Sequence, residues 1–119
     1  MKLFLFSIFV VLALFVACST AQPGVENIEA SEARSLVSNG ALLVDVRSDS
    51  EYESGHIDGA IHIPHDQIAD RISELGSDKS RKIVLYCRSG RRAGGAAGIL
   101  VTNGFTEVYN AGGYSSLAN

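Results

Sequence analysis

Two strongly apolar segments, each followed at once by polar residues, most constrain how this chain can fold. Residues 41–46 are apolar except for Asp45 and lead into Arg47, and residues 82–86 are apolar after Lys82 and lead into Cys87. Continuous apolar runs of this length are typical of strands buried on both faces of a parallel sheet. The sequence therefore predicts an α/β fold whose central strands end at one polar edge.

Helix-type and strand-type patterns alternate along the rest of the chain, as expected for such a sheet. Further strands are expected over residues 60–63 and 106–109. Helices are expected over residues 28–40, 49–54, 66–76 and from the end of the 87–92 segment to about residue 102. Because the chain has 119 residues, this pattern fits one compact domain with helices on both faces of the sheet.

Residues 1–21 have the pattern of an export signal. Lys2 precedes an apolar stretch over residues 3–17, which is shorter than the ~20 residues that a membrane-spanning helix needs. Two processing sites are open: a small-x-small site ending at Ala21, and a site before Cys18 that resembles the lipobox of bacterial lipoproteins. We expect an exported, periplasmic protein that is soluble after the first cleavage and lipid-anchored through Cys18 after the second.

The expected domain boundaries follow from this leader. Residues 22–27 are interpreted as a tether, and residues 28–119 as the folded domain. Either processing site leaves Cys87 as the only cysteine inside that domain, so no intramolecular disulfide can form there. With 19% charged residues and a formal net charge of -3, the chain lacks the basic character of a nucleic-acid binder.

Residues that suggest chemistry are concentrated where the second apolar strand runs into the following helix. The segment consists of Cys87, Arg88, Ser89, Gly90, Arg91 and Arg92. A thiol just before a helix gains from the unpaired N–H groups and the positive end of the helix dipole, and the arginines add cations. This pattern favours a reactive thiolate in an electropositive, partly exposed place, although a small buried hydrophobe beside a solvated basic patch is the alternative.

Two further features support a binding loop. A glycine such as Gly90 allows a positive φ, so that backbone N–H groups can converge on one sulfur atom. Ligands of open parallel sheets bind beyond the carboxyl ends of the strands, which is where Asp45 and Cys87 are expected to be neighbours.

Four motifs, in this order, make the chain similar to single-domain rhodaneses, in particular the exported phage-shock type of thiosulfate sulfurtransferase. They are residues 43–47 with Glu51 and Tyr52 after them, residues 55–60 leading to Ile63 and Pro64, the loop of residues 87–92, and residues 110–113. The resemblance covers about residues 28–119. It implies a rhodanese-like five-stranded parallel sheet, a Cys87 persulfide that takes sulfur from thiosulfate, and transfer of that sulfur to cyanide or a thiol.

The resemblance also implies roles for single residues. Cys87 is the nucleophile, the backbone N–H groups from Arg88 through Ser89, Gly90 and Arg91 to Arg92 hold the persulfide, and the side chains of Arg88 and Arg91 attract the donor. Asp45 is expected to pair with Arg92 and Arg47 with Glu51, which would brace the loop. His56 belongs to a structural turn. No metal or organic cofactor is implied, and the expected partners are a small-molecule sulfur donor and acceptor acting on a monomer, with no nucleic acid.

Other functions remain open. Phosphatases and arsenate reductases of the Cdc25 kind share the fold but place five residues between cysteine and arginine, whereas four separate Cys87 from Arg92. This shorter cradle suits sulfur better than a tetrahedral phosphate. A non-catalytic rhodanese-like binding module is disfavoured by the presence of Cys87, and a thiol oxidoreductase by the lack of a second cysteine to resolve a mixed disulfide.

Overall fold

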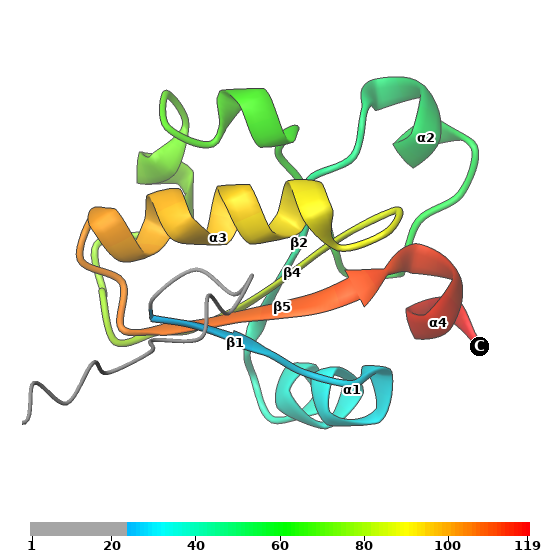
Figure 1. The fold of residues 1–119 in the computed structure, drawn as a ribbon, viewed down its shortest axis with the longest axis horizontal. Helices are drawn as coiled ribbons and strands as arrows, with labels where there is room; N and C mark the ends of the chain where they lie inside the picture. The colour runs from blue at the N-terminus through cyan, green and yellow to red at the C-terminus, as the bar shows by residue number, and fades with distance from the viewer. Residues whose placement is uncertain (1–23) are drawn as a thin grey trace, which may run out of the picture.

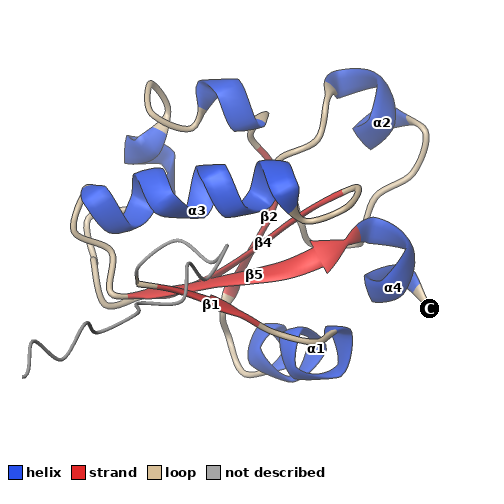
Figure 2. Cartoon of the chain, in the orientation of Figure 1, coloured by secondary structure: helices blue, strands red, loops and turns tan. Residues whose placement is uncertain are grey.

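The computed structural model describes residues 24–119, which form one parallel five-stranded sheet (Figures 1 and 2). The strands, in the spatial order β1-β5-β4-β2-β3, are β1 Val25–Asn27, β5 Glu107–Gly113, β4 Lys82–Cys87, β2 Leu42–Asp45 and β3 Ile61–His62. The predicted α/β class and parallel sheet are confirmed. The export signal over residues 1–21, the alternative processing site at Cys18 and the start of the tether lie outside the described residues.

Helices cover both faces of the sheet, as predicted. Figure 1 shows α3, Arg91–Thr102, along one face, and α1, Ala30–Ser38, with α4, Tyr114–Ala118, on the other. The short helix α2, Asp49–Glu53, follows the carboxyl end of β2. Among residues 24–119, no helix is long and apolar enough to cross a membrane.

Side chains along the central strands alternate between two buried clusters. Leu85 and Cys87 of β4 belong to the cluster on the α3 side, whereas Val84 and Tyr86 belong to the cluster on the side of α1 and α4. Successive residues of a strand point to opposite faces, so this alternation fixes the direction of every side chain at the end of the strand. Cys87 therefore faces α3.

Two parts of the expected layout are wrong. Val25–Asn27, expected within the tether over residues 22–27, instead forms β1, because Val25 is buried and the segment pairs with β5. The helix expected over residues 66–76 is replaced by two short 3₁₀ turns, His65–Gln67 and Ile72–Leu75. Residues after β5 form α4, which buries Leu117 against the sheet.

The interruption of the segment 66–76 has a local cause. Arg71 leaves the helical region, with φ −112° and ψ 16°, and its guanidinium donates hydrogen bonds to the Glu74 carboxylate and to the His62 carbonyl oxygen. Ile68 and Leu75 are nevertheless fully buried, as their spacing predicts. The hydrophobic pattern therefore identified the buried face but not the backbone conformation.

Candidate active site

Cys87 lies at the carboxyl end of the central strand β4, at the start of a tight loop. The loop turns at Gly90, whose φ of +96° is left-handed as predicted, and α3 begins directly afterwards at Arg91. The Gly90 N–H donates a hydrogen bond to the Cys87 Sγ at 2.9 Å. The backbone thus directs a positive dipole at the sulfur atom, where it stabilises negative charge.

The Cys87 side chain is more enclosed than the sequence predicts. A partly exposed thiol was expected, but the residue is 0% exposed and packs in the cluster with Leu85 and Ala93. The cause is the direction of the last residue of β4, which points under the start of α3. The sulfur therefore lies beneath the start of α3 instead of opening to solvent.

Arg92 connects the loop to α2. Its guanidinium donates to both carboxylate oxygens of Glu51, at 2.7 and 3.0 Å. Hydrogen bonding to Glu51 is the main cause that raises the pKa of Arg92, and the neighbouring Cys87 raises this pKa further. Glu51 also accepts hydrogen bonds from the N–H and hydroxyl of Ser48, which caps α2. One carboxylate therefore caps a helix and holds the arginine beside the cysteine.

The ion pairs expected from the resemblance are exchanged. Asp45 pairs with Arg47, at 2.7 Å, instead of with Arg92, and Glu51 pairs with Arg92 instead of with Arg47. Asp45 lies two residues after Leu43 on β2 and so shares its face, on the side of α1 and α4, whereas Arg92 belongs to α3 on the opposite face.

The Asp45–Arg47 pair consequently supports a different segment. Arg47 donates a hydrogen bond to the Gly55 carbonyl oxygen at 2.6 Å, and its guanidinium lies 4.2 Å from the centre of the Tyr114 ring. Asp45 is fully buried and the Arg47 side chain is 6% exposed. The pair joins the end of β2 to the turn after α2 and to α4. It braces one wall of the site. The expectation that this pair supports the 87–92 loop directly is wrong.

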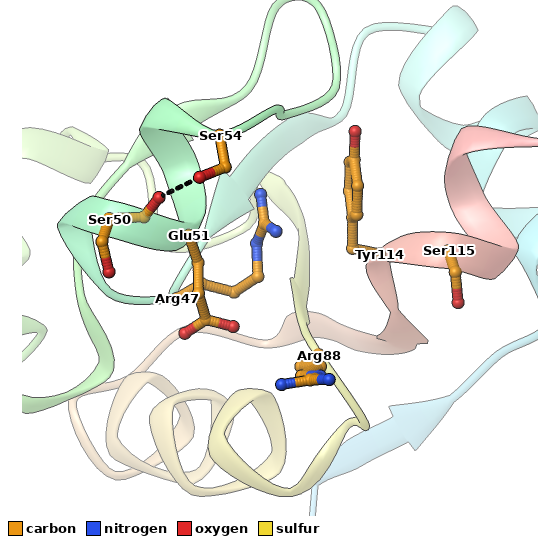
Figure 3. A pocket seen from close by; sticks show the side chains of 7 residues that line it. All are labelled: Arg47, Ser50, Glu51, Ser54, Arg88, Tyr114 and Ser115. Carbon is orange, nitrogen blue, oxygen red and sulfur yellow. Dashed lines mark hydrogen bonds between the residues drawn. The ribbon is translucent and has the colours of Figure 1, made fainter.

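An open pocket of about 480 Å³ lies beside the loop (Figure 3). Helix α2, the loop and helix α4 contribute most of its lining, which consists of Arg47, Ser50, Glu51, Ser54, Arg88, Tyr114 and Ser115. Arg47 and Glu51 are held in the ion pairs described above, whereas no ion pair among the described residues engages Arg88. Arg88 is therefore the cation of this lining that can bind an anion without breaking an existing pair.

The two arginines expected to attract a donor occupy different places. Arg88 lines the pocket of Figure 3, whereas Arg91 lines a separate depression with His65 and Gly95 on the side of α3. Ser89 and Gly90 line a third depression together with Asn110. The structure therefore divides the expected substrate-binding residues among several surfaces.

Sequence reasoning named Glu51 but missed the other pocket residues of the α2 segment and those of α4. Tyr114 and Ser115 directly follow β5, which neighbours β4, so the carboxyl ends of these strands lie at the same edge. This topology was the available signal. Among residues 24–119, no group of three or more histidine, cysteine or acidic side chains is arranged to hold a metal ion.

His56 and His62 pack against Tyr52 from α2. The ring centres lie 3.8 Å and 4.4 Å from that of Tyr52, and each histidine contacts a backbone carbonyl, of Tyr52 and of Arg47 respectively. These contacts suit a structural role in holding α2 and the following turn.

Gly113→Ala is expected to displace the loop and reduce activity strongly. A Cβ at this position would lie far inside contact distance of the Arg88 carbonyl oxygen, so the backbone must shift, at a cost of about 1–3 kcal/mol. Gly95→Ala is the matched control, because a Cβ there meets no atom within 4 Å and α3 should gain stability. Urea unfolding and turnover should be measured for both variants; equal activity would show that Gly113 does not support the loop.

Stability should depend on Glu51 in acid. Hydrogen bonding from Arg92, and then from Ser48, lowers the pKa of Glu51 from 4.5 to about 2. The contribution of the ionised carboxylate is therefore complete above pH 4.5 and is lost as the pH falls through about 2. The urea midpoints of the wild type and of Glu51→Gln should converge as the pH falls from 4.5 to about 2. A difference that stays constant over this pH range would contradict the lowered pKa of Glu51.

Comparisons with known proteins agree with the fold. The model of the rhodanese-like domain family matches residues 29–119. Thiosulfate sulfurtransferase PspE of Escherichia coli (strain K12) is 40% identical over 75 residues, covering 63% of this chain and 72% of the relative. Thiosulfate sulfurtransferase GlpE of Pseudomonas syringae pv. syringae is 39% identical over 88 residues, covering 74% and 81%.

Solved structures give the same result. A structure of rhodanese with anions from E. coli superposes with a TM-score of 0.63 at 38% identity, covering 66% of this chain and 93% of the other. The human single-domain sulfurtransferase superposes with a TM-score of 0.67 at 26% identity, covering 77% and 94%. Because the rhodanese-like domain model matches residues 29–119 and these structures share the fold, the chain belongs to the rhodanese-like domain family.

Proposed function

We propose that this protein is a thiosulfate sulfurtransferase that carries sulfur on Cys87. The observation that carries the proposal is the Gly90 N–H, which points at the Cys87 Sγ from 2.9 Å at the start of α3. The sulfurtransferase relatives supply the reaction class. We propose that it acts as a monomer.

The chemistry proceeds in two displacements. The Cys87 thiolate attacks the outer sulfur of thiosulfate, a new S–S bond forms, and sulfite leaves with the electron pair of the broken S–S bond. Cyanide or a thiolate then attacks the outer sulfur of the persulfide, which gives thiocyanate or a new persulfide and restores the Cys87 thiolate. Negative charge is conserved in both steps, so the chain's task is to hold anionic sulfur rather than to move protons.

The loop supports this reaction over phosphoryl chemistry. One backbone N–H already lies at hydrogen-bond distance from Sγ, and Arg92, the arginine of the cradle, is occupied by both oxygens of Glu51. The decisive assay compares thiocyanate formation from thiosulfate and cyanide with hydrolysis of an aryl phosphate. We expect turnover only in the first; turnover only in the second would favour the phosphatase alternative.

Arg88→Ala should raise the KM for thiosulfate by at least about tenfold, because a hydrogen bond to a charged group contributes about 1.5–3 kcal/mol. Arg91→Ala should change it much less, since Arg91 lines a different depression. Steady-state kinetics of the two single variants at equal ionic strength test this difference. A larger effect of Arg91→Ala would place the donor on the α3 side.

We further propose that the protein is exported to the periplasm. The support is the sequence of residues 1–21, with a basic start, an apolar stretch and two possible processing sites. Cys18→Ala distinguishes the two sites: movement from the membrane fraction to the soluble fraction supports lipidation. An unchanged soluble fraction supports cleavage after Ala21, and an unprocessed cytoplasmic chain would contradict export.

A further inference from the structure

The motif of residues 110–113 has a residue whose contacts the sulfur-transfer proposal does not use. Asn110, in the middle of β5, donates a hydrogen bond from Nδ2 to the Gly90 carbonyl oxygen at 2.9 Å. Its Oδ1 accepts a hydrogen bond from the Gly112 N–H at 3.0 Å. Both amide atoms are matched to suitable partners, so the orientation of the side-chain amide is determined by its hydrogen bonds.

The surrounding backbone makes room for this amide. A Cβ on Gly94 would lie 3.3 Å from Asn110 Nδ2, and one on Gly90 would lie 3.7 and 3.8 Å from the two amide atoms. Gly94 lies inside α3, where a glycine costs ~1 kcal/mol relative to alanine. Accommodation of the Asn110 side chain between the loop and α3 accounts for this glycine.

Gly90 needs a restraint from outside the loop. Glycine has the widest choice of backbone conformations, and at residue 90 a single conformation must direct the N–H at Sγ. Its carbonyl oxygen is held by two donors, the Asn110 amide and the Gly94 N–H, both at 2.9 Å. The residue that stabilises sulfur on one side is thus anchored on the other.

We propose that Asn110 is a positioning residue for sulfur transfer. It keeps Gly90 in the left-handed conformation in which its N–H meets the sulfur, and it joins the loop to β5, where the Gly112 N–H holds the orientation of its amide. It acts through Gly90 and does not touch the sulfur itself. The inference rests on the proposed function, since the reaction it serves is formation of the Cys87 persulfide.

The effect should fall on the chemical step. A catalytic hydrogen bond is useful because its donor is already in place when charge develops, and a donor that must first be reoriented loses part of that benefit. Arg88, which we expect to attract the donor, lies in another pocket from Asn110. Loss of the Asn110 amide should therefore lower the rate of persulfide formation without a matching change in the KM for thiosulfate.

Asn110→Ala and Asn110→Asp test the proposal with different deletions. The alanine variant removes both hydrogen bonds, whereas the aspartate variant keeps an acceptor for the Gly112 N–H but cannot donate to the Gly90 carbonyl. Asn103→Ala is the matched control: Asn103 donates to the Ile99 carbonyl at 2.8 Å at the far end of α3 and is exposed. For each full-length variant, single-turnover sulfite release, the KM for thiosulfate and the urea midpoint should be measured.

We expect sulfite release to slow by roughly tenfold in both Asn110 variants and to stay unchanged in Asn103→Ala, with KM changed less than twofold. The Gly90 amide resonance should also shift in NMR spectra of both Asn110 variants. Unchanged rates of sulfite release would overturn the proposal. So would a fall in rate that parallels the fall in the urea midpoint in all three variants. If the wild type itself forms no persulfide, the proposed function fails; the Gly90 resonance still reports whether Asn110 positions the loop.

Discussion

Cys87→Ser is expected to lower thiosulfate-dependent sulfur transfer at least about 10³-fold, the scale on which loss of a catalytic nucleophile acts. A serine hydroxyl at this position cannot form a persulfide, because the transferred atom must bond to sulfur and leave again. Thiocyanate formation from thiosulfate and cyanide gives the rate directly.

The substitution should leave the fold intact. Cys87 is buried, and serine has nearly the same size, so a stability loss should come only from burying a hydroxyl in place of a thiol. The Gly90 N–H that donates to Sγ can donate to the serine oxygen instead. A folded Cys87→Ser protein with more than a few per cent of wild-type turnover would show that Cys87 is not the nucleophile.

Asp45→Ala is expected to destabilise the protein by about 3–5 kcal/mol, which is the usual cost of leaving one partner of a buried ion pair uncompensated. Asp45 is 0% exposed and accepts hydrogen bonds from the Arg47 guanidinium at 2.7 to 3.1 Å and from the Arg47 N–H at 2.9 Å. Without the carboxylate, the Arg47 charge stays buried between the Gly55 turn and Tyr114.

An exposed ion pair of the same chain is the control for this substitution. Arg71 and Glu74 are paired at 2.6 Å, but their side chains are 35% and 49% exposed. Glu74→Ala should therefore cost at most about 1 kcal/mol. Urea unfolding of the two variants gives the comparison, and equal losses would show that burial does not decide the strength of the Asp45–Arg47 pair.

The sequence determined the central strands and the chemical loop well because their signals are local. The apolar segments before Arg47 and before Cys87 form β2 and β4, and Gly90 has the left-handed φ that a tight cradle needs. The strand β1 was missed because three residues are too few to show a period, and its assignment depends on pairing with β5.

The ion pairs were predicted in the wrong combination for a reason that the strand pattern could have shown. Asp45 lies two residues after Leu43, so its side chain is on the face of α1 and α4. Cys87 lies two residues after Leu85, so its thiol is on the face of α3. Arg92, at the start of α3, was therefore out of reach for Asp45. The partnership of Glu51 with Arg92 depends on the position of α2, which no local pattern fixes.

The pocket beside the loop could not be read from spacing at all. Its lining comes from α2, the loop and α4, which are brought together by the order of the strands rather than by proximity in sequence. Asn110 is a similar case, because one of its two hydrogen bonds connects β5 to the carbonyl oxygen of Gly90, 20 residues earlier in the chain. Such contacts follow from topology, so they become visible only once the sheet order is known.

Intact-mass measurement of the purified protein after incubation with thiosulfate tests the central claim most directly. The account predicts a mass increase of one sulfur atom on Cys87, release of one sulfite per adduct, and loss of the added mass on treatment with cyanide. Absence of any adduct on folded wild-type protein, or an adduct that persists in Cys87→Ser, would contradict it.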